Sequence, residues 1–275
     1  MESWIGREIV QQDVLTPGLL ARFRATIDSA DTGDAAAQGI HWCLCVPEVS
    51  TAELDVDGHP KRGGFLPPIA LPRRMWASSA VEFHAPLHIG AQITRRSVIV
   101  DMVEKQGGSG PLVFVSIDHE SRADGAIAIS ERQTLVYRDA STAEPTPPGT
   151  GAPKLADWSW HRVLTPSAPF LFRYSALTFN SHRIHYDWPY ARNEEGYRGL
   201  VVHGPLLATL LLDLASHKLG SNALRRFSFR GQSPAFADEV LHLVGKSQGQ
   251  KITLAALGSD GRTVMSADAE GSTPE

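Results

Sequence analysis

This sequence contains few cysteines. It also has no excess of positive charge and no long apolar run. Its only two cysteines, Cys43 and Cys45, lie one residue apart in an apolar run. If that run is a strand, both thiols point to the same face, with Cα atoms near the upper limit for a bridge. We therefore expect two buried thiols, and nothing indicates an oxidising compartment.

The charge balance and the apolar pattern exclude further classes of partner. The 26 basic residues against 30 acidic ones give a formal charge of −4, which offers no global attraction to a nucleic-acid backbone. The longest strongly apolar run, residues 206–214, is interrupted by Thr209 and Asp213 and is far shorter than the roughly 20 residues of a membrane span. The first residues, MESWIGRE, lack the basic start and the apolar stretch of a signal peptide. We expect a cytoplasmic protein with neither a nucleic-acid nor a membrane partner.

A linker divides the 275-residue chain into two halves of similar size. Residues 138–157 are rich in proline, glycine, serine, threonine and alanine, with almost nothing apolar enough to pack. In residues 1–137 and again in residues 158–275, a phenylalanine, Phe83 or Phe229, precedes a turn and a run of alternating apolar residues. Such alternation is typical of half-buried strands. The shared order suggests two copies of one α+β unit.

Two helices are predicted from their caps and apolar stripes. Thr16 and Pro17 open a surface helix with one buried face. A second helix begins at Pro205 and ends near Leu219, before Gly220. Its leucines leave little exposed face, so we expect a sheet to wrap it.

The chemistry is concentrated just before that second helix. Three of the 11 histidines, His182, His185 and His203, lie within 22 residues. The step from His203 to Gly204 leads to a helix N-terminus, whose unpaired N–H groups suit an oxyanion. Hydration of a conjugated thioester needs a polarised carbonyl, which the Gly204 N–H can supply. It also needs a held and deprotonated water, for which His185 and Asn180 are the candidates.

The segment TFNSHRIHYD, residues 178–187, resembles the MaoC-like hydratases and dehydratases, together with LVVHG at residues 200–204. The resemblance covers nearly the full chain. It is closer to the subgroup of mesaconyl-C4-CoA and itaconyl-CoA hydratases and mitochondrial-type hydroxyacyl-thioester dehydratases. It implies an α+β double hot dog, in which each unit wraps a curved antiparallel sheet around a long helix. It also implies a site at the junction of the halves, an N-terminal unit without catalytic residues of its own, and no metal or other cofactor.

The chain departs from the family's Asp-x-Asn-Pro-x-His pattern at the aspartate. Counting back from His185 by the family's spacing puts Asn180 at that position, and a second register puts Thr178 there. An amide can position a water but cannot accept its proton. We therefore expect His185 to be the general base, with Asn180 orienting the water and Asp187 as a candidate to orient the imidazole.

Other interpretations of these residues stay open. His182 and His185, with Asp187 nearby, could instead bind a metal, although the segment holds no fourth ligand at characteristic spacing. His203 could simply set the turn, and Gly204 could simply start the helix.

Substrate contacts are expected from the same segment. Arg183 is the first candidate for the CoA phosphates, and a solvated face is the alternative. Thr178, His182, Asp187 and His203 are further candidates for contact with the substrate.

The sequence thus predicts an enzyme, a carbon–oxygen lyase, that reversibly adds water to an enoyl-CoA to give a hydroxyacyl-CoA. The subgroup resemblance alone implies a mesaconyl or itaconyl acyl group. One competing hypothesis is a hot dog thioesterase, which would need an acidic residue near Gly204. Another is a non-catalytic acyl-CoA-binding protein that kept the fold after losing the aspartate. A homodimer is a further expectation.

Overall fold

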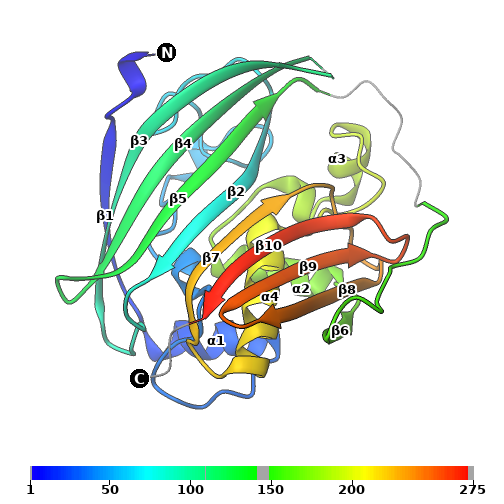
Figure 1. The fold of residues 1–275 in the computed structure, drawn as a ribbon. Coiled ribbons are helices and arrows are strands. Elements are labelled where there is room, and N and C mark those ends of the chain that lie inside the picture. Colours follow the sequence, from blue (N-terminus) through cyan, green and yellow to red (C-terminus); the bar gives the residue numbers. More distant parts are fainter. Residues whose placement is uncertain (1, 109, 141–148, 272–275) are drawn as a thin grey trace.

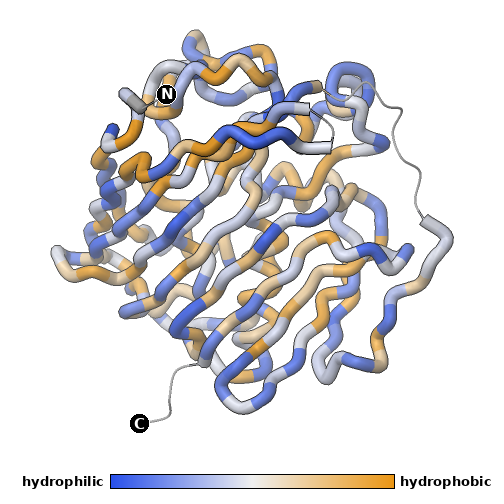
Figure 2. Tube along the Cα trace, turned by 45° about the horizontal axis from the view of Figure 1, so that its top comes forward, coloured by the Kyte–Doolittle hydropathy of each residue, from blue (hydrophilic) through white to orange (hydrophobic). Residues whose placement is uncertain are grey.

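In the computed structural model, which describes residues 2–108, 110–140 and 149–271, the strands form one antiparallel sheet (Figure 1). Its order is β1-β3-β4-β5-β2-β7-β10-β9-β8-β6. The first five strands are β1 (Glu8–Val14), β2 (Arg73–Phe83), β3 (Gln92–Gly107), β4 (Gly110–Ala123) and β5 (Ala126–Arg138). The others are β6 (Trp160–Leu164), β7 (Leu224–Gly231), β8 (Leu241–Gln248), β9 (Lys251–Gly258) and β10 (Thr263–Gly271). Figure 2 shows hydrophobic and hydrophilic residues alternating along these strands.

The two groups of strands meet where β2 pairs with β7. Their register runs from Ser78 opposite Arg230 to Glu82 opposite Arg226. β5 ends at Arg138, the first residue of the predicted linker, and β6 begins at Trp160, after its last residue. Residues 141–148 of that linker lie outside the described residues, and the domain boundaries stay a prediction.

Both predicted helices are present. α1 (Pro17–Ile27) begins after Thr16, whose hydroxyl accepts a hydrogen bond from the Leu19 N–H, and it buries one face. α4 (Gly204–Leu219) begins one residue before the predicted start, and residues 206–215 are all buried. It contacts β2 and all the strands from β6 to β10, so the predicted sheet does wrap it (Figure 1). None of the described helices is long and apolar enough to cross a membrane.

The N-terminal half departs from the expectation of a long helix in each unit. Between α1 and β2 its described residues form only the short 3-10 helices η2 (Ile40–Cys43) and η3 (Thr51–Glu53). Residues 47–72 contain five prolines and three glycines, which are the two residue types least favourable in a helix interior. Phe65, Leu66 and Ile69 of this loop pack on the cluster that includes Val115 and Tyr137. The loop therefore covers the N-terminal sheet where a long helix was expected.

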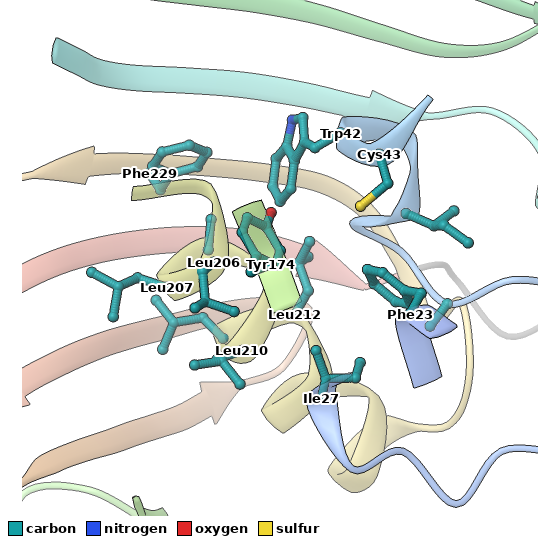
Figure 3. Close-up of a cluster of buried hydrophobic side chains, with 14 of the residues drawn as sticks. Phe23, Ile27, Trp42, Cys43, Tyr174, Leu206, Leu207, Leu210, Leu212 and Phe229 are labelled. Carbon is teal, nitrogen blue, oxygen red and sulfur yellow. The ribbon is translucent and has the colours of Figure 1, made fainter. Parts of the chain in front are cut away.

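The main core joins the two halves. Figure 3 shows Trp42 and Cys43 of η2 beside Tyr174 and the leucines of α4. The Trp42 ring also meets Phe229 of β7 edge-on, with centroids 5.8 Å apart. Cys43 and Cys45 are buried free thiols, as predicted, although their segment is not a strand. Burial raises the pKa of the Cys43 thiol to about 12, which leaves it unreactive.

Candidate active site

The predicted catalytic segment folds into short helices that lead toward α4. These are α2 (Ala168–Leu177), η4 (Arg183–His185) and α3 (Trp188–Asn193). α2 ends in a left-handed turn at Phe179, with φ of 46°, and the Asn180 N–H donates to the Ser175 carbonyl at 2.8 Å. This is the Schellman arrangement, in which a left-handed residue lets the chain reverse at a helix end. The chain therefore changes direction just before the histidine segment begins.

His185 is held in one orientation by the chain that leads to α4. Its Nδ1 lies 2.7 Å from the Val201 carbonyl oxygen. Because a carbonyl only accepts, Nδ1 carries the proton and Nε2 is left as an acceptor. Burial, followed by the neighbouring His203 and His182, lowers the pKa of His185 well below 6.5. The buried imidazole is therefore neutral at pH 7 and able to take a proton.

His203 stacks on His185 immediately before α4. The ring centroids are 3.6 Å apart and the planes differ by 19°. Nε2 of His203 lies 2.8 Å from the Ser175 hydroxyl, whereas its Nδ1 is buried without a hydrogen-bond partner among the described residues. Burial, and then His182, lower the pKa of His203 to about 3. A buried nitrogen without a partner is costly, so a bound group that pairs with it would be stabilised.

Gly204 is the first residue of α4, where N–H groups have no acceptor within the helix. A Cβ added there would meet only the Trp76 carbonyl oxygen, at 3.9 Å. Packing of the described residues thus does not require glycine at this position. Glycine has no side chain, however, so a substrate oxygen can approach the backbone closely at this position.

Three of the other predicted residues are engaged locally. The Thr178 hydroxyl donates to the Tyr174 carbonyl at 2.8 Å. Asp187 caps α3 through the Tyr190 N–H and pairs with Arg183 at 2.8 Å. The expected role of Asp187 in orienting the imidazole is therefore wrong, because the Val201 carbonyl does this instead. Arg183 also lies over the Tyr190 ring, with its charge already compensated by Asp187.

Asn180 and His182 shape the turn between α2 and η4. The Asn180 side-chain oxygen accepts from the His182 N–H at 2.9 Å. His182 is buried, and its ring meets His185 edge-on at 5.4 Å. Nε2 of His182 lies 3.9 Å from a Glu195 carboxylate oxygen. The structure thus places His182, His185 and His203 in one row of rings.

A loop of the N-terminal half is attached to this segment by hydrogen bonds, a contact that was not predicted from the sequence. The Asp57 carbonyl accepts from the Arg183 N–H at 2.9 Å, and the Gly58 carbonyl accepts from the Ser181 hydroxyl at 2.5 Å. The Val56 carbonyl accepts from the Arg183 guanidinium at 3.1 Å. In the sequence, the run Asp57-Gly58-His59 indicates a turn. The single feature that could have marked it as part of the site is the placement of an acid and a histidine on either side of a glycine.

The loop brings Asp57 and His59 to the row of histidines. Asp57 Oδ2 lies 3.0 Å from His59 Nδ1, and the His59 ring lies 4.0 Å from that of His182. The ligand atoms of Asp57, His59 and His182 all lie within 4.8 Å of one another, a grouping that could hold a metal. However, two imidazoles on one tetrahedral zinc, with bonds of about 2.0–2.1 Å, hold their ring centroids roughly 5 Å apart. The observed 4.0 Å, with the ring planes tilted by 38°, is shorter than that spacing and fits direct ring contact better.

Docking of this loop depends on Gly58. Its φ is +87°, and an added Cβ would lie 1.9 Å from the Ser181 carbonyl oxygen. We expect Gly58→Ala to lower both the melting temperature and the activity, because the loop must move off the segment. Gly63→Ala is the matched control, since Gly63 has a similar φ of +93° but nothing within 4 Å of the added Cβ. Thermal melts and activity assays compare the two variants. Equal losses in both would show that backbone strain, and not contact of the loop with the segment, causes the effect of Gly58→Ala.

The neutral, buried His203 makes stability depend on pH. In the unfolded chain this histidine binds a proton below about pH 6.5, but in the folded protein its pKa is about 3. Between these values the unfolded state binds more protons, so the free energy of unfolding should fall as pH drops from 6.5 toward 4, with no contribution above 6.5. Urea unfolding of wild type and His203→Gln measures this free energy across that pH range. Plotted against pH, it should have a shallower slope in the variant. The same slope in both proteins would contradict a depressed pKa at His203.

Comparison with known proteins places the chain in a family. The sequence profile of the hydroxyacyl-thioester dehydratase type 2 family (Htd2) matches residues 39–237. The chain is 43% identical to a mesaconyl-C(4)-CoA hydratase of Chloroflexus aurantiacus, over 98% of this chain and 96% of that protein.

Solved structures show the fold. A MaoC-like dehydratase from Phytophthora capsici has a TM-score of 0.72 at 15% identity, covering 98% of this chain and 97% of that one. A Mycobacterium tuberculosis protein with a double hotdog fold has a TM-score of 0.59 at 11% identity, covering 97% and 96%. The predicted double hot dog is confirmed, and among the described residues the long helix lies in the C-terminal half, with none in the N-terminal half. The chain belongs to the hydroxyacyl-thioester dehydratase type 2 family of carbon–oxygen lyases.

Proposed function

We propose that this enzyme adds water reversibly to a short unsaturated acyl-CoA, with mesaconyl-C4-CoA or itaconyl-CoA as the candidate substrates. The observation that carries the proposal is the environment of His185. Its imidazole is buried and neutral, has its Nδ1 proton on Val201, and stacks against the residue that precedes α4. That combination provides a base with one defined acceptor nitrogen beside a helix N-terminus.

We infer the following mechanism for these groups. The thioester carbonyl accepts a hydrogen bond from the Gly204 N–H and faces the positive end of the α4 dipole. A water donates to Nε2 of His185, and as its O–H bond breaks, its oxygen bonds to C3. The electrons of the double bond move toward the thioester oxygen, where the Gly204 N–H stabilises the enolate. The proton on His185 then bonds to C2, which restores the neutral base. The same steps in reverse remove water from a 3-hydroxyacyl thioester.

The acyl group is suggested by the Chloroflexus relative, whose name gives mesaconyl-C(4)-CoA as its substrate. For the CoA phosphates we keep Arg183 as the candidate, since its side chain is 38% exposed at the edge of the segment. Its pairing with Asp187 means that a phosphate would have to share or replace that carboxylate. A homodimer and a cytoplasmic location stay predictions of the sequence.

Loss of enoyl-thioester absorbance with crotonyl-CoA, mesaconyl-C4-CoA and itaconyl-CoA tests the proposal. We expect hydration by wild type and a fall in kcat of about 10²–10⁴-fold in His185→Ala, the usual contribution of a general base. Asn180→Ala should lose less, because its amide positions the His182 backbone and a water rather than accepting a proton. His84→Gln is the control, since His84 is exposed and, among the described residues, its ring is hydrogen-bonded to the Ser130 hydroxyl alone.

Two results would contradict the proposed reaction. Release of free thiol without hydration would identify a thioesterase. Binding of the CoA esters without turnover, unchanged in His185→Ala, would identify an acyl-CoA-binding protein.

A further inference from the structure

The inner face of the N-terminal sheet carries an arginine without a carboxylate partner. Arg74 of β2 lies directly opposite Tyr137 of β5 in the antiparallel register. Residues opposite one another in a sheet share a face, and Tyr137 is fully buried in the cluster beneath Phe65 and Ile69. The half-buried Arg74 side chain therefore points to the same inner face. Among the described residues it forms no ion pair with a carboxylate.

The Tyr137 hydroxyl also lacks a partner. It is buried, and no described group forms a hydrogen bond of good geometry with it. Burial raises the pKa of Tyr137, and the charge and close approach of Arg74, followed by the charge of Arg62, partly offset this. Both guanidinium groups therefore lie near the phenol.

Arg62 does not bring a negative charge to this group. Its guanidinium donates to the carbonyls of Ile69, Leu71 and Pro72, which leaves its charge without a carboxylate in the part of the chain that the structure describes. Burial of unpaired charges and hydroxyls is costly. A carboxylate or a phosphate would accept two parallel hydrogen bonds from an arginine and a further one from the phenol. The inner face at Arg74 thus fits an anion.

β2 connects this anion site to the start of α4. A Cβ added at Gly204 would lie 3.9 Å from the Trp76 carbonyl oxygen, so α4 begins against Trp76. The Trp76 ring meets the buried Phe229 ring, with centroids 6.0 Å apart, and therefore faces the inner side. Arg74 is two residues away, so it shares that face and its Cα lies about 7 Å along the strand. Its charge, after burial, also lowers the pKa of His59, in the loop bound to the catalytic segment.

Two parts of an acyl-CoA ester could supply the anion, namely the CoA phosphates and a free carboxylate on the acyl group. The acyl chain is attached directly to the thioester carbonyl that we place at the Gly204 N–H. In a four-carbon diacid the two carboxyl carbons are three bonds apart, or about 4 Å. The CoA phosphates are separated from the thioester by the whole pantetheine arm. The short span from Gly204 to Arg74 therefore favours the acyl carboxylate.

We propose that Arg74, assisted by Tyr137, binds the free carboxylate of the acyl group and so selects dicarboxylic acyl-CoA esters. The inference rests on the proposed hydration reaction, whose candidate substrates, mesaconyl-C4-CoA and itaconyl-CoA, both carry such a carboxylate. Arg74 and Tyr137 determine specificity and transfer no proton. Because they hold the carboxylate equally in the bound substrate and in the transition state, their loss should raise KM more than it lowers kcat.

The test compares mesaconyl-C4-CoA with crotonyl-CoA, which has the same CoA but no acyl carboxylate. We expect Arg74→Ala to raise KM for mesaconyl-C4-CoA about 10–10²-fold, the usual effect of losing a charge-assisted hydrogen bond. KM for crotonyl-CoA should change less than about threefold. Arg74→Lys keeps the charge without the planar fork, so its loss should be smaller, about tenfold or less.

Tyr137→Phe separates ligand binding from a structural role. It removes a buried hydroxyl that has no partner among the described residues, so the melting temperature should not fall. KM for mesaconyl-C4-CoA should nevertheless rise about fivefold. A variant that melts earlier and loses activity equally with both esters would contradict the proposed contact.

Arg132→Ala is the matched control, since Arg132 also lies on the N-terminal sheet but is 61% exposed and paired with Asp118. It should change neither KM. An unchanged KM for mesaconyl-C4-CoA in Arg74→Ala would overturn the inference. Equal losses with the two esters, or a raised inhibition constant for free CoA, would also overturn it, because phosphate binding or a structural role predicts them.

Failure of the proposed function gives a different result. Absence of hydration of every ester by wild type would overturn the proposed reaction. For any ester that wild type does not hydrate, the calorimetric Kd for wild type and Arg74→Ala replaces KM. Weaker binding of mesaconyl-C4-CoA alone in the variant would still support the carboxylate site, and equal binding of both esters by the two proteins would overturn it.

Discussion

The site depends on the hydrogen bond between the His185 ring and the Val201 carbonyl, 2.7 Å long. A second bond, from the Val201 N–H to the Ile184 carbonyl, completes the pairing of η4 with the chain that leads to α4. Together they place the base against His203 and the start of the helix, and they fix which ring nitrogen can accept a proton. Breaking this pairing would free the imidazole to rotate and would separate the base from the proposed oxyanion site at Gly204.

The two halves of the chain differ in what packs against their strands. The C-terminal unit keeps a long helix wrapped by strands, and the N-terminal unit has a proline-rich loop in the corresponding place. That loop reaches the C-terminal half of the chain and binds the predicted catalytic segment through its backbone carbonyls. The N-terminal unit, which was expected to have no catalytic residues of its own, thus contributes a loop that holds the predicted catalytic segment.

Local signals explain what could be predicted from the sequence. The cap at Thr16, the leucines of residues 206–215 and the glycine after Leu219 each act within a few residues, and α1 and α4 follow from them. Asp57 and His59 could not be found in this way, since they reach residues 181–183 through tertiary contacts that leave no periodic pattern. The resemblance also implied a long helix in the N-terminal half, where prolines and glycines make one unfavourable.

The proposed reaction requires a neutral His185 with its proton on Nδ1 and with Nε2 free to accept a proton from water. Nitrogen-15 NMR of ring-labelled histidines, with His185 assigned by its absence in His185→Ala, reports the tautomer directly. We predict a protonated Nδ1 and an unprotonated Nε2 at pH 7, unchanged when the pH is lowered to 6. A proton on Nε2 at pH 7, or an imidazolium at that pH, would contradict the account.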